Sequence, residues 1–151
     1  MDFYQFESPI GTISVSGEKN ELTGVYLPGM PTPRSASKET PVRKMAEHQI
    51  LEYLNGDRRE FEIPYLFNGT AFQNAVWKKI VHIPYGSMVT YKDVAKAIGR
   101  PAAYQAVGNA LHDNPLPLIL PCHRVVGQKG ELGGYVAGEE LKYRLLVLEG
   151  L

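Results

Sequence analysis

The only cysteine of the chain, Cys122, is followed directly by His123, and the pair has the chemistry of an activated nucleophile. A thiol attacks as its thiolate, and a neighbouring imidazole is one of the groups that lower a thiol pKa. The pair comes after the apolar segment Leu116–Leu120 and Pro121, and proline cannot continue a strand or helix at that point. We therefore expect Cys122 on a rigid turn at the end of a buried segment. The alternative is a small core residue, which is what a lone cysteine usually is.

The residues around this pair favour the catalytic interpretation. The segment PCHRVVG (Pro121–Gly127) is preceded by Asn114-Pro115 and followed by Gly133-Gly134-Tyr135. This arrangement resembles the active-site signature of the O6-alkylguanine-DNA alkyltransferases, and the resemblance spans roughly Gly69 to Gly150. It implies direct repair of double-stranded DNA: an alkyl group passes irreversibly from guanine O6 to the cysteine, once per chain, after the base is rotated out of the duplex.

The resemblance implies a catalytic relay. Cys122 matches the alkyl acceptor, His123 the general base that takes its proton through a water, and Glu149 the carboxylate that orients the imidazole. An acid at the end of a helix is disfavoured by the helix dipole, which independently indicates a role for Glu149. Tyr91 matches the tyrosine that hydrogen-bonds guanine N3, and Asn114 matches the asparagine that braces the turn before the cysteine.

In this family the base is bound largely by backbone groups. The resemblance implies that the carbonyls of Cys122 and Val125 accept from the guanine amino group, and that Tyr135 lines the pocket. The N–H of Val136 would meet O6, but valine stands where many relatives have serine, so one hydroxyl contact is absent. Ala137 stands where many relatives have glycine, so we expect a narrower pocket for bulky alkyl groups.

Two short helices are predicted before the cysteine segment. Thr90–Asp93 has capping-box spacing for the first, which ends at Gly99. Pro101 suits the first position of the second helix, expected over about Ala102–Leu111. This is a helix-turn-helix pattern, although an ordinary helical hairpin fits it equally well.

Small residues on the second helix, Ala106 and Gly108, favour DNA binding because they let a backbone lie close to a groove. The resemblance implies the minor groove. Arg100 and His112 are candidates for phosphate contacts or plain surface roles. Most relatives have an arginine that fills the gap left by the flipped base, and Gln105 stands in its place, which puts base extrusion in doubt. The candidate DNA-binding residues are Arg100, Tyr104, Gln105, Ala106, Gly108, His112 and Arg124.

The predicted fold class is α+β, with a domain at 1–66 and a second at 69–151. In the first domain, Ile13 and Val15 alternate with Thr12, Ser14 and Ser16. This alternation predicts an antiparallel meander with one solvent-exposed face. The sheet and one amphipathic helix give a ribonuclease H-like layout. The expected elements are strands over residues 3–6, 12–16 and 22–27, a loop over 28–41, a helix over 42–54, and a strand or extended link over 57–64.

The second domain is expected to be helical. Thr70 can cap a helix that runs to Ile80, and Glu140–Leu148 is the final helix. Gln128–Gly130 has the composition of a hairpin turn. A helix-turn-helix followed by a small β-hairpin is a winged-helix layout.

Composition limits the partners and the compartment. Sixteen basic and sixteen acidic residues cancel, so any DNA contact must be local. One cysteine excludes an intramolecular disulfide and favours a reducing, cytoplasmic compartment. We see no signal peptide and no run of about 18 apolar residues for a membrane. The histidines lack metal-ligand spacing, so we expect no metal ion. We also expect no cofactor and a monomer.

Two other functions fit part of this pattern. A non-catalytic, damage-sensing alkyltransferase-like protein would bind the same DNA, but such proteins replace the acceptor cysteine, which Cys122 retains. A cysteine hydrolase could use Cys122 and His123, but its base normally comes from elsewhere in the fold. Intact-protein mass after exposure to alkylated DNA separates the three, as a permanent gain, no change or transient acylation.

Overall fold

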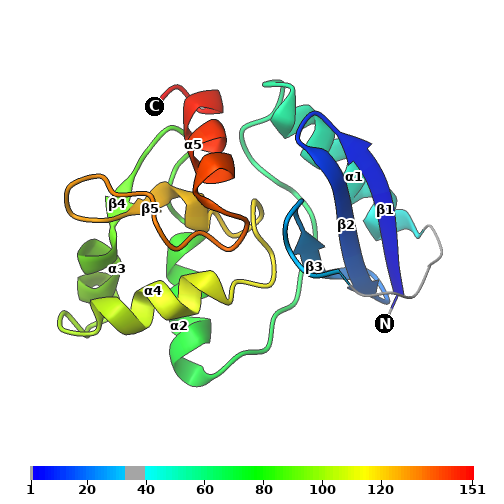
Figure 1. Cartoon of the computed structure of the whole chain (residues 1–151). Coiled ribbons are helices and arrows are strands. Elements are labelled where there is room, and N and C mark those ends of the chain that lie inside the picture. Colours follow the sequence, from blue (N-terminus) through cyan, green and yellow to red (C-terminus); the bar gives the residue numbers. More distant parts are fainter. Residues whose placement is uncertain (1, 33–39) are drawn as a thin grey trace. The chain divides into compact units, whose positions relative to one another are not determined.

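The structure is a computed structural model that describes residues 2–32 and 40–151. The chain divides into two compact units, Met1–Phe67 and Asn68–Leu151 (Figure 1). Part of the loop predicted over residues 28–41, residues 33–39, lies outside the described residues.

Three antiparallel strands and one helix form the first unit. Strands β1 (Asp2–Ser8), β2 (Gly11–Glu18) and β3 (Glu21–Tyr26) lie in the order β1-β2-β3. Helix α1 (Pro41–Leu54) contacts all three strands and lies along one face of the sheet (Figure 1). The predicted meander and helix are confirmed. Ile13 and Val15 of the sheet and Ala46 and Ile50 of the helix are fully buried in the core of this unit.

The expectation that Ser14 and Ser16 face water is wrong, since they are 1% and 0% exposed. They lie on the central strand, with a neighbour on each side. The hydroxyl oxygens of Ser16 and Thr23 are 3.0 Å apart. A Cβ at Gly24 would meet Ser16 Oγ at 2.6 Å and the Tyr26 ring at 3.1 Å, so the missing side chain lets Tyr26 lie beside Ser16. Of the three residues predicted on the solvent-exposed face, only Thr12 is exposed.

Residues 57–64 form the extended link rather than a further strand. The Leu22 N–H donates to Pro64 O at 2.8 Å and the Leu66 N–H to Leu22 O at 2.9 Å, which makes only a single bridge to β3. The buried amide of Gln49 on α1 binds the backbone of Glu62 twice, accepting from its N–H (2.8 Å) and donating to its carbonyl (3.3 Å). A side chain therefore takes the place of a strand partner.

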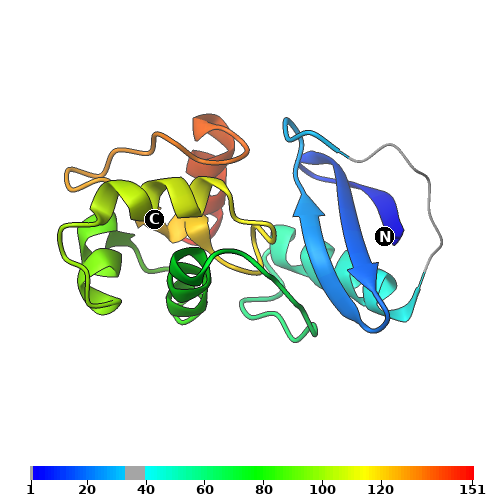
Figure 2. The same ribbon diagram turned by 90° about the horizontal axis from the view of Figure 1, so that it is seen from below.

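The second unit contains most of the helices. Its elements are α2 (Ala71–Ile80), β4 (Val89–Thr90), α3 (Tyr91–Ala97), α4 (Tyr104–His112), a 3₁₀ turn η1 (Cys122–Arg124), β5 (Val125–Val126) and α5 (Glu139–Leu148). Helices α2, α3 and α4 contact one another (Figure 2). Complete capping boxes begin α2, with Thr70 and Gln73, and α3, with Thr90 and Asp93, which confirms both predicted starts.

The predicted start of the second helix is wrong. Helix α4 begins at Tyr104, and residues 100–103 form a turn closed by the Ala103 N–H donating to Arg100 O at 2.9 Å. Pro101 is the second residue of that turn. The fixed φ of proline suits this position as well as the first residue of a helix, so the sequence did not distinguish them.

The β-hairpin wing is also wrong, although the predicted turn exists. The Gly127 N–H donates to Glu131 O and the Gly130 N–H to Gly127 O, each at 2.9 Å. The strand before the turn, β5, pairs in parallel with β4, and residues 127–138 contain no second strand. Gly133 and Gly134 explain this, because glycine has low strand propensity. Residues 131–138 instead form an irregular segment, the 131–138 loop.

Candidate active site

The cysteine lies where the sequence places it, on the short turn η1 after a buried segment. Leu116, Leu118 and Leu120 are at most 1% exposed, and Leu118 has a φ of +79°, which is rare for a residue with a side chain. The Leu120 N–H donates to Leu116 O at 2.8 Å, and the Cys122 N–H to Leu120 O at 2.7 Å. These two hydrogen bonds fix the backbone conformation of the segment up to Cys122.

The amide of Asn114 fixes both ends of the segment. Its Oδ1 accepts from the Leu116 N–H at 2.9 Å. Its Nδ2 donates to Leu120 O at 2.9 Å and to Cys122 Sγ at 3.0 Å. Asn114 is 2% exposed, so these bonds are shielded from water. The expected brace is therefore present, and it also gives the sulfur a hydrogen-bond donor that favours its anionic form.

Burial raises the pKa of the Cys122 thiol to about 11, although the Asn114 hydrogen bond and the Lys142 charge both oppose the rise. The side chain is 3% exposed. At neutral pH the resting sulfur is therefore a protonated thiol, and it needs a base before it can attack an electrophile.

Glu149 sits at the end of α5 with its carboxylate fully buried. Oε2 lies 2.7 Å from His123 Nε2 and accepts from Arg124 Nη2 at 2.9 Å. Oε1 accepts from Arg124 Nε at 2.9 Å and from the Gly86 N–H at 3.0 Å. Burial by itself raises the pKa of Glu149, but the hydrogen bonds from His123, Arg124 and Gly86 outweigh it and hold the pKa well below its usual range.

This carboxylate sets the state of the imidazole. Because a carboxylate only accepts hydrogen bonds, Nε2 of His123 carries the hydrogen, and Nδ1 holds the lone pair in the neutral ring. Burial lowers the pKa of His123, against the opposing effect of Glu149. His123 is therefore neutral at pH 7, as a general base must be.

The predicted DNA contact of Arg124 is wrong. Its side chain is 7% exposed, and besides Glu149 it donates to Ile83 O at 2.7 Å and lies 5.6 Å from the Tyr85 ring. The guanidinium balances the buried carboxylate instead of facing solvent. A motif identifies an arginine but not its partner, and Glu149 is 25 residues away.

Lys142 belongs to the site and was missed from the sequence. Its ammonium donates to Val125 O at 2.6 Å and lies 5.8 Å from the Tyr91 ring and 6.0 Å from the Tyr135 ring. Burial lowers its pKa, and the charges of Cys122 and Glu139 oppose that. One signal was available: Lys142 precedes Leu145 and Leu146 by three and four residues, so it falls on the buried face of α5.

Val125, Tyr91 and Tyr135, three of the predicted site residues, lie around this lysine. The Tyr91 hydroxyl donates to Gly133 O at 3.0 Å, and burial, with the charges of Cys122 and Glu131, raises the pKa of Tyr91. Tyr135 is 6% exposed, and the next two residues, Val136 and Ala137, are half-buried. Segments distant in sequence are thus brought to one place.

The predicted DNA-binding residues lie mainly on the open side of α4. Gln105, Ala106 and His112 are exposed, and Gly108 is half-buried. Tyr104 is 40% exposed, with Lys92 Nζ 5.2 Å from its ring. The exposed Arg100 places its guanidinium 5.9 Å from the Phe72 ring. This surface contains the small residues that the sequence indicated, without a dense cluster of cations.

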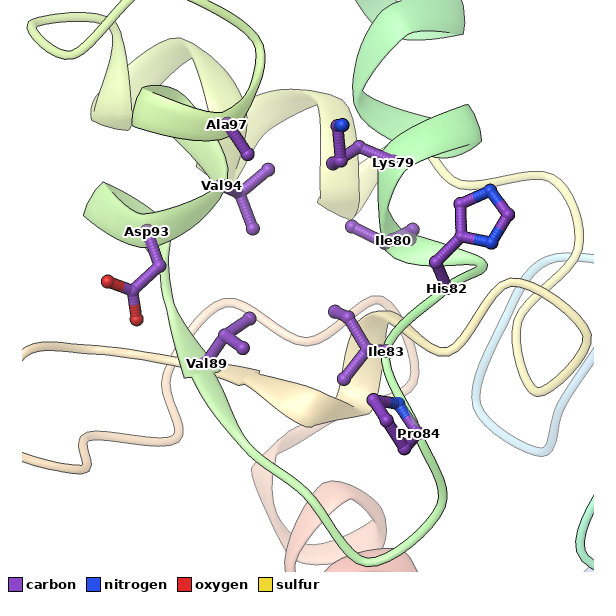
Figure 3. A pocket seen from close by; sticks show the side chains of 9 residues that line it. All are labelled: Lys79, Ile80, His82, Ile83, Pro84, Val89, Asp93, Val94 and Ala97. Carbon is purple, nitrogen blue, oxygen red and sulfur yellow. The ribbon is translucent and has the colours of Figure 1, made fainter.

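A separate groove of about 250 Å³ lies between α2, α3 and β4 (Figure 3). The side chains of Ile80, Ile83, Val89 and Val94 point into it. Its lining residues are Lys79, Ile80, His82, Ile83, Pro84, Val89, Asp93, Val94 and Ala97. None of them is a predicted site residue, and the groove does not include Cys122.

Within residues 2–32 and 40–151, no group of three or more histidine, cysteine or acidic side chains is placed to hold a metal ion. None of the helices in the same ranges is long and apolar enough to cross a membrane.

Comparison with known proteins gives consistent matches. The family 6-O-methylguanine DNA methyltransferase, DNA binding domain, matches residues 71–151. The methylated-DNA–protein-cysteine methyltransferase of Methanosarcina acetivorans is 40% identical over 149 residues, which are 96% of each protein. The constitutive Bacillus subtilis enzyme of the same name is 37% identical, covering 99% of this chain and 96% of its own. The Mycobacterium tuberculosis OGT, crystallised in complex with DNA, has a TM-score of 0.91 at 36% identity, over 97% of this chain and 91% of its own.

Replacing Glu149 by glutamine keeps the shape of the side chain but removes its charge. The Arg124 guanidinium would then be buried without a counter-charge, so we expect the free energy of unfolding to fall by about 3–5 kcal/mol. Urea denaturation measures the loss. Glu140→Gln, on the exposed first turn of the same helix, serves as a control and should change it by less than about 0.5 kcal/mol. Equal losses in the two variants would contradict the assignment.

Acidification should destabilise the protein in two steps of the same sign. The folded-state pKa of His123 lies below its ordinary value of 6.5, so below that pH the unfolded chain binds the proton more readily. The folded-state pKa of Glu149 lies below 4.5, so its contribution is complete above that pH and is lost as the pH falls further. Urea unfolding measured from about pH 7.5 to about pH 2.5 should show one loss of stability that begins near pH 6.5 and a second that begins near pH 4.5. His123→Gln should remove the upper step.

Proposed function

The chain belongs to the family of methylated-DNA–protein-cysteine methyltransferases, and from this premise we propose that Cys122 is its alkyl acceptor. It is an O6-methylguanine DNA methyltransferase that repairs alkylated DNA directly. The residue assignment rests on the hydrogen bonds around the Cys122 sulfur and its neighbour His123. Asn114 holds Sγ on the turn that also carries His123, and Glu149 holds that histidine in turn.

The transfer is a displacement at the alkyl carbon. Cys122 Sγ forms a bond to that carbon while the bond between the carbon and O6 breaks. The electron pair of the broken bond stays on O6, which leaves a guanine anion. His123 accepts the thiol proton at Nδ1 through a water, and a proton then returns to the guanine anion. Glu149 is a positioning residue that keeps Nδ1 free of hydrogen. The product is a thioether, which has no good leaving group, so each chain reacts once.

The charges around the sulfur favour this reaction. The Cys122 thiol has a pKa of about 11 even with the Asn114 amide and the Lys142 ammonium beside it, both of which lower that pKa. A neutral imidazole can therefore hold only a small fraction of the sulfur as thiolate at any moment. The thiolate therefore forms transiently, during the reaction.

We further propose that duplex DNA containing an alkylated guanine is the substrate and that the exposed side of α4 meets it. The M. tuberculosis relative crystallised with DNA supports this proposal. The flipped base would lie between Tyr91, Tyr135, Val136 and Ala137, with the Val125 carbonyl toward its amino group. A non-catalytic damage sensor is not favoured, because Cys122 is present and the full-length relatives are methyltransferases.

Incubation with duplex DNA carrying O6-methylguanine should add one methyl group to each chain and no more. Intact-protein mass spectrometry with excess substrate measures the stoichiometry, and peptide mapping should place the methyl group on Cys122. Cys122→Ser removes the thiol with almost no change in shape and serves as the control, with no gain expected. Transfer of more than one equivalent per chain, or any transfer in the serine variant, would overturn the assignment.

Gln105 is exposed at the second position of α4, where the family resemblance implies an arginine. Glutamine is shorter and uncharged, so it should stabilise an extrahelical base less, by about 1–2 kcal/mol. Gln105→Arg should therefore speed single-turnover repair of duplex DNA by roughly 5- to 30-fold. The rate with free O6-benzylguanine, which needs no base flipping, should stay the same.

Asn109→Arg is the matched control for added charge, because Asn109 is exposed on α4 one turn later. If both arginines speed duplex repair equally, the gain comes from charge alone and the flipping role is excluded. If Gln105→Arg gains nothing, a neighbouring side chain already occupies the gap.

A further inference from the structure

Two helices hold two consecutive carbonyl groups of the 131–138 loop. The Tyr91 hydroxyl, on the first residue of α3, donates to Gly133 O at 3.0 Å. Nδ1 of His112, the last residue of α4, lies 3.1 Å from Gly134 O. A carbonyl oxygen only accepts, so Nδ1 of His112 carries the hydrogen of this bond. The loop is thus joined directly to both helices of the predicted helix-turn-helix.

The loop needs such anchors. Backbone hydrogen bonds tie it near its two ends, from the Gly127 N–H to Glu131 O and from the Gly138 N–H to Tyr135 O. Between them lie Gly133 and Gly134, and Gly134 has a φ of +84°. Glycine has the largest backbone freedom to lose on ordering, so the sequence of the loop does not by itself fix one conformation. Side chains from outside the loop must supply that restriction.

The position of the second bond gives it a specific consequence. The Gly134 carbonyl belongs to the peptide group that joins Gly134 to Tyr135. Holding that carbonyl orients the peptide plane and therefore the direction in which the chain enters Tyr135. Tyr135 is buried, with its ring 6.0 Å from the Lys142 ammonium, and Val136 and Ala137 come directly after it.

We propose that His112 is a positioning residue for the substrate pocket, holding through the Gly134 carbonyl the wall formed by residues 135–137. The proposal rests on the proposed function, which places the alkylated base against that wall. It gives His112 a role different from the phosphate contact considered from the sequence. The bond needs only a hydrogen on Nδ1, which this ring nitrogen can carry and donate to the carbonyl.

The two roles predict different results with two substrates. A phosphate contact acts only when DNA is present. A bond that shapes the pocket acts on any alkylated guanine that enters it, including the free base. The comparison of duplex DNA with free O6-benzylguanine therefore distinguishes them.

The test measures single-turnover rates of His112→Ala and His112→Asn on both substrates, by intact-protein mass. His112→Ala should slow both reactions by a similar factor, about 3- to 10-fold, which corresponds to one exposed hydrogen bond. His112→Asn, whose side-chain amide can donate to the same carbonyl, should recover most of the rate. Asn109→Ala, at an exposed position on the same helix, is the control and should leave the free-base rate unchanged.

A loss confined to duplex DNA would overturn the proposal in favour of a phosphate contact. No loss on either substrate would overturn it as well. These results are distinct from a failure of the proposed function, in which the unaltered protein itself would transfer no alkyl group to Cys122. His112 is exposed, so the variants are expected to fold, and thermal unfolding checks this.

A spectroscopic measurement tests the bond without catalysis. Nitrogen-15 NMR of the unaltered protein should show the neutral ring of His112 with its hydrogen on Nδ1. A ring with hydrogen on Nε2 would show that the bond to Gly134 is absent in solution and would overturn the proposal.

Discussion

The buried carboxylate of Glu149 is the constraint on which the second unit depends. An ionised group inside a protein is tolerated only when hydrogen bonds and opposite charge replace its water. Here the replacements come from His123 and Arg124 on η1 and from the Gly86 N–H before β4. The end of α5, the cysteine turn and the segment before β4 must therefore adopt one arrangement together. The same bonds that stabilise this unit also orient the imidazole beside the nucleophile.

The two buried cations of the site have separate tasks. Arg124 neutralises Glu149, which lets the carboxylate hold His123 without forcing a proton onto it. Lys142 binds a neutral carbonyl, that of Val125, so its charge is not cancelled there and still acts on the Cys122 sulfur. If the lysine were paired with a carboxylate, the thiolate would lose that support. The choice of partners therefore directs one positive charge toward His123, the proposed base, and the other toward Cys122, the proposed acceptor.

Local rules and the family signature predicted different parts of the molecule. Capping at Thr70 and Thr90 and the apolar spacing of α1 were readable because each depends on residues a few positions apart. The resemblance named Asn114 and Glu149, which the structure brings to Cys122 and His123 respectively. Two of the predictions that failed depended on distant partners: Arg124 pairs with a glutamate in another element, and β5 pairs with β4 rather than with the chain just after it. Neither partner leaves a mark on the local sequence.

The resting state of the thiol suits a protein that each reaction consumes. A thiol that is 3% exposed, with a pKa of about 11, reacts slowly with small electrophiles and oxidants in solution. A permanently ionised, accessible thiolate would react with them and be lost without repairing DNA. The protein instead keeps the sulfur protonated, with the Asn114 amide bonded to it and the Lys142 charge acting on it. In the proposed reaction, reactivity then depends on an alkylated guanine in the pocket, so the burial that raises the thiol pKa also makes the single reaction selective.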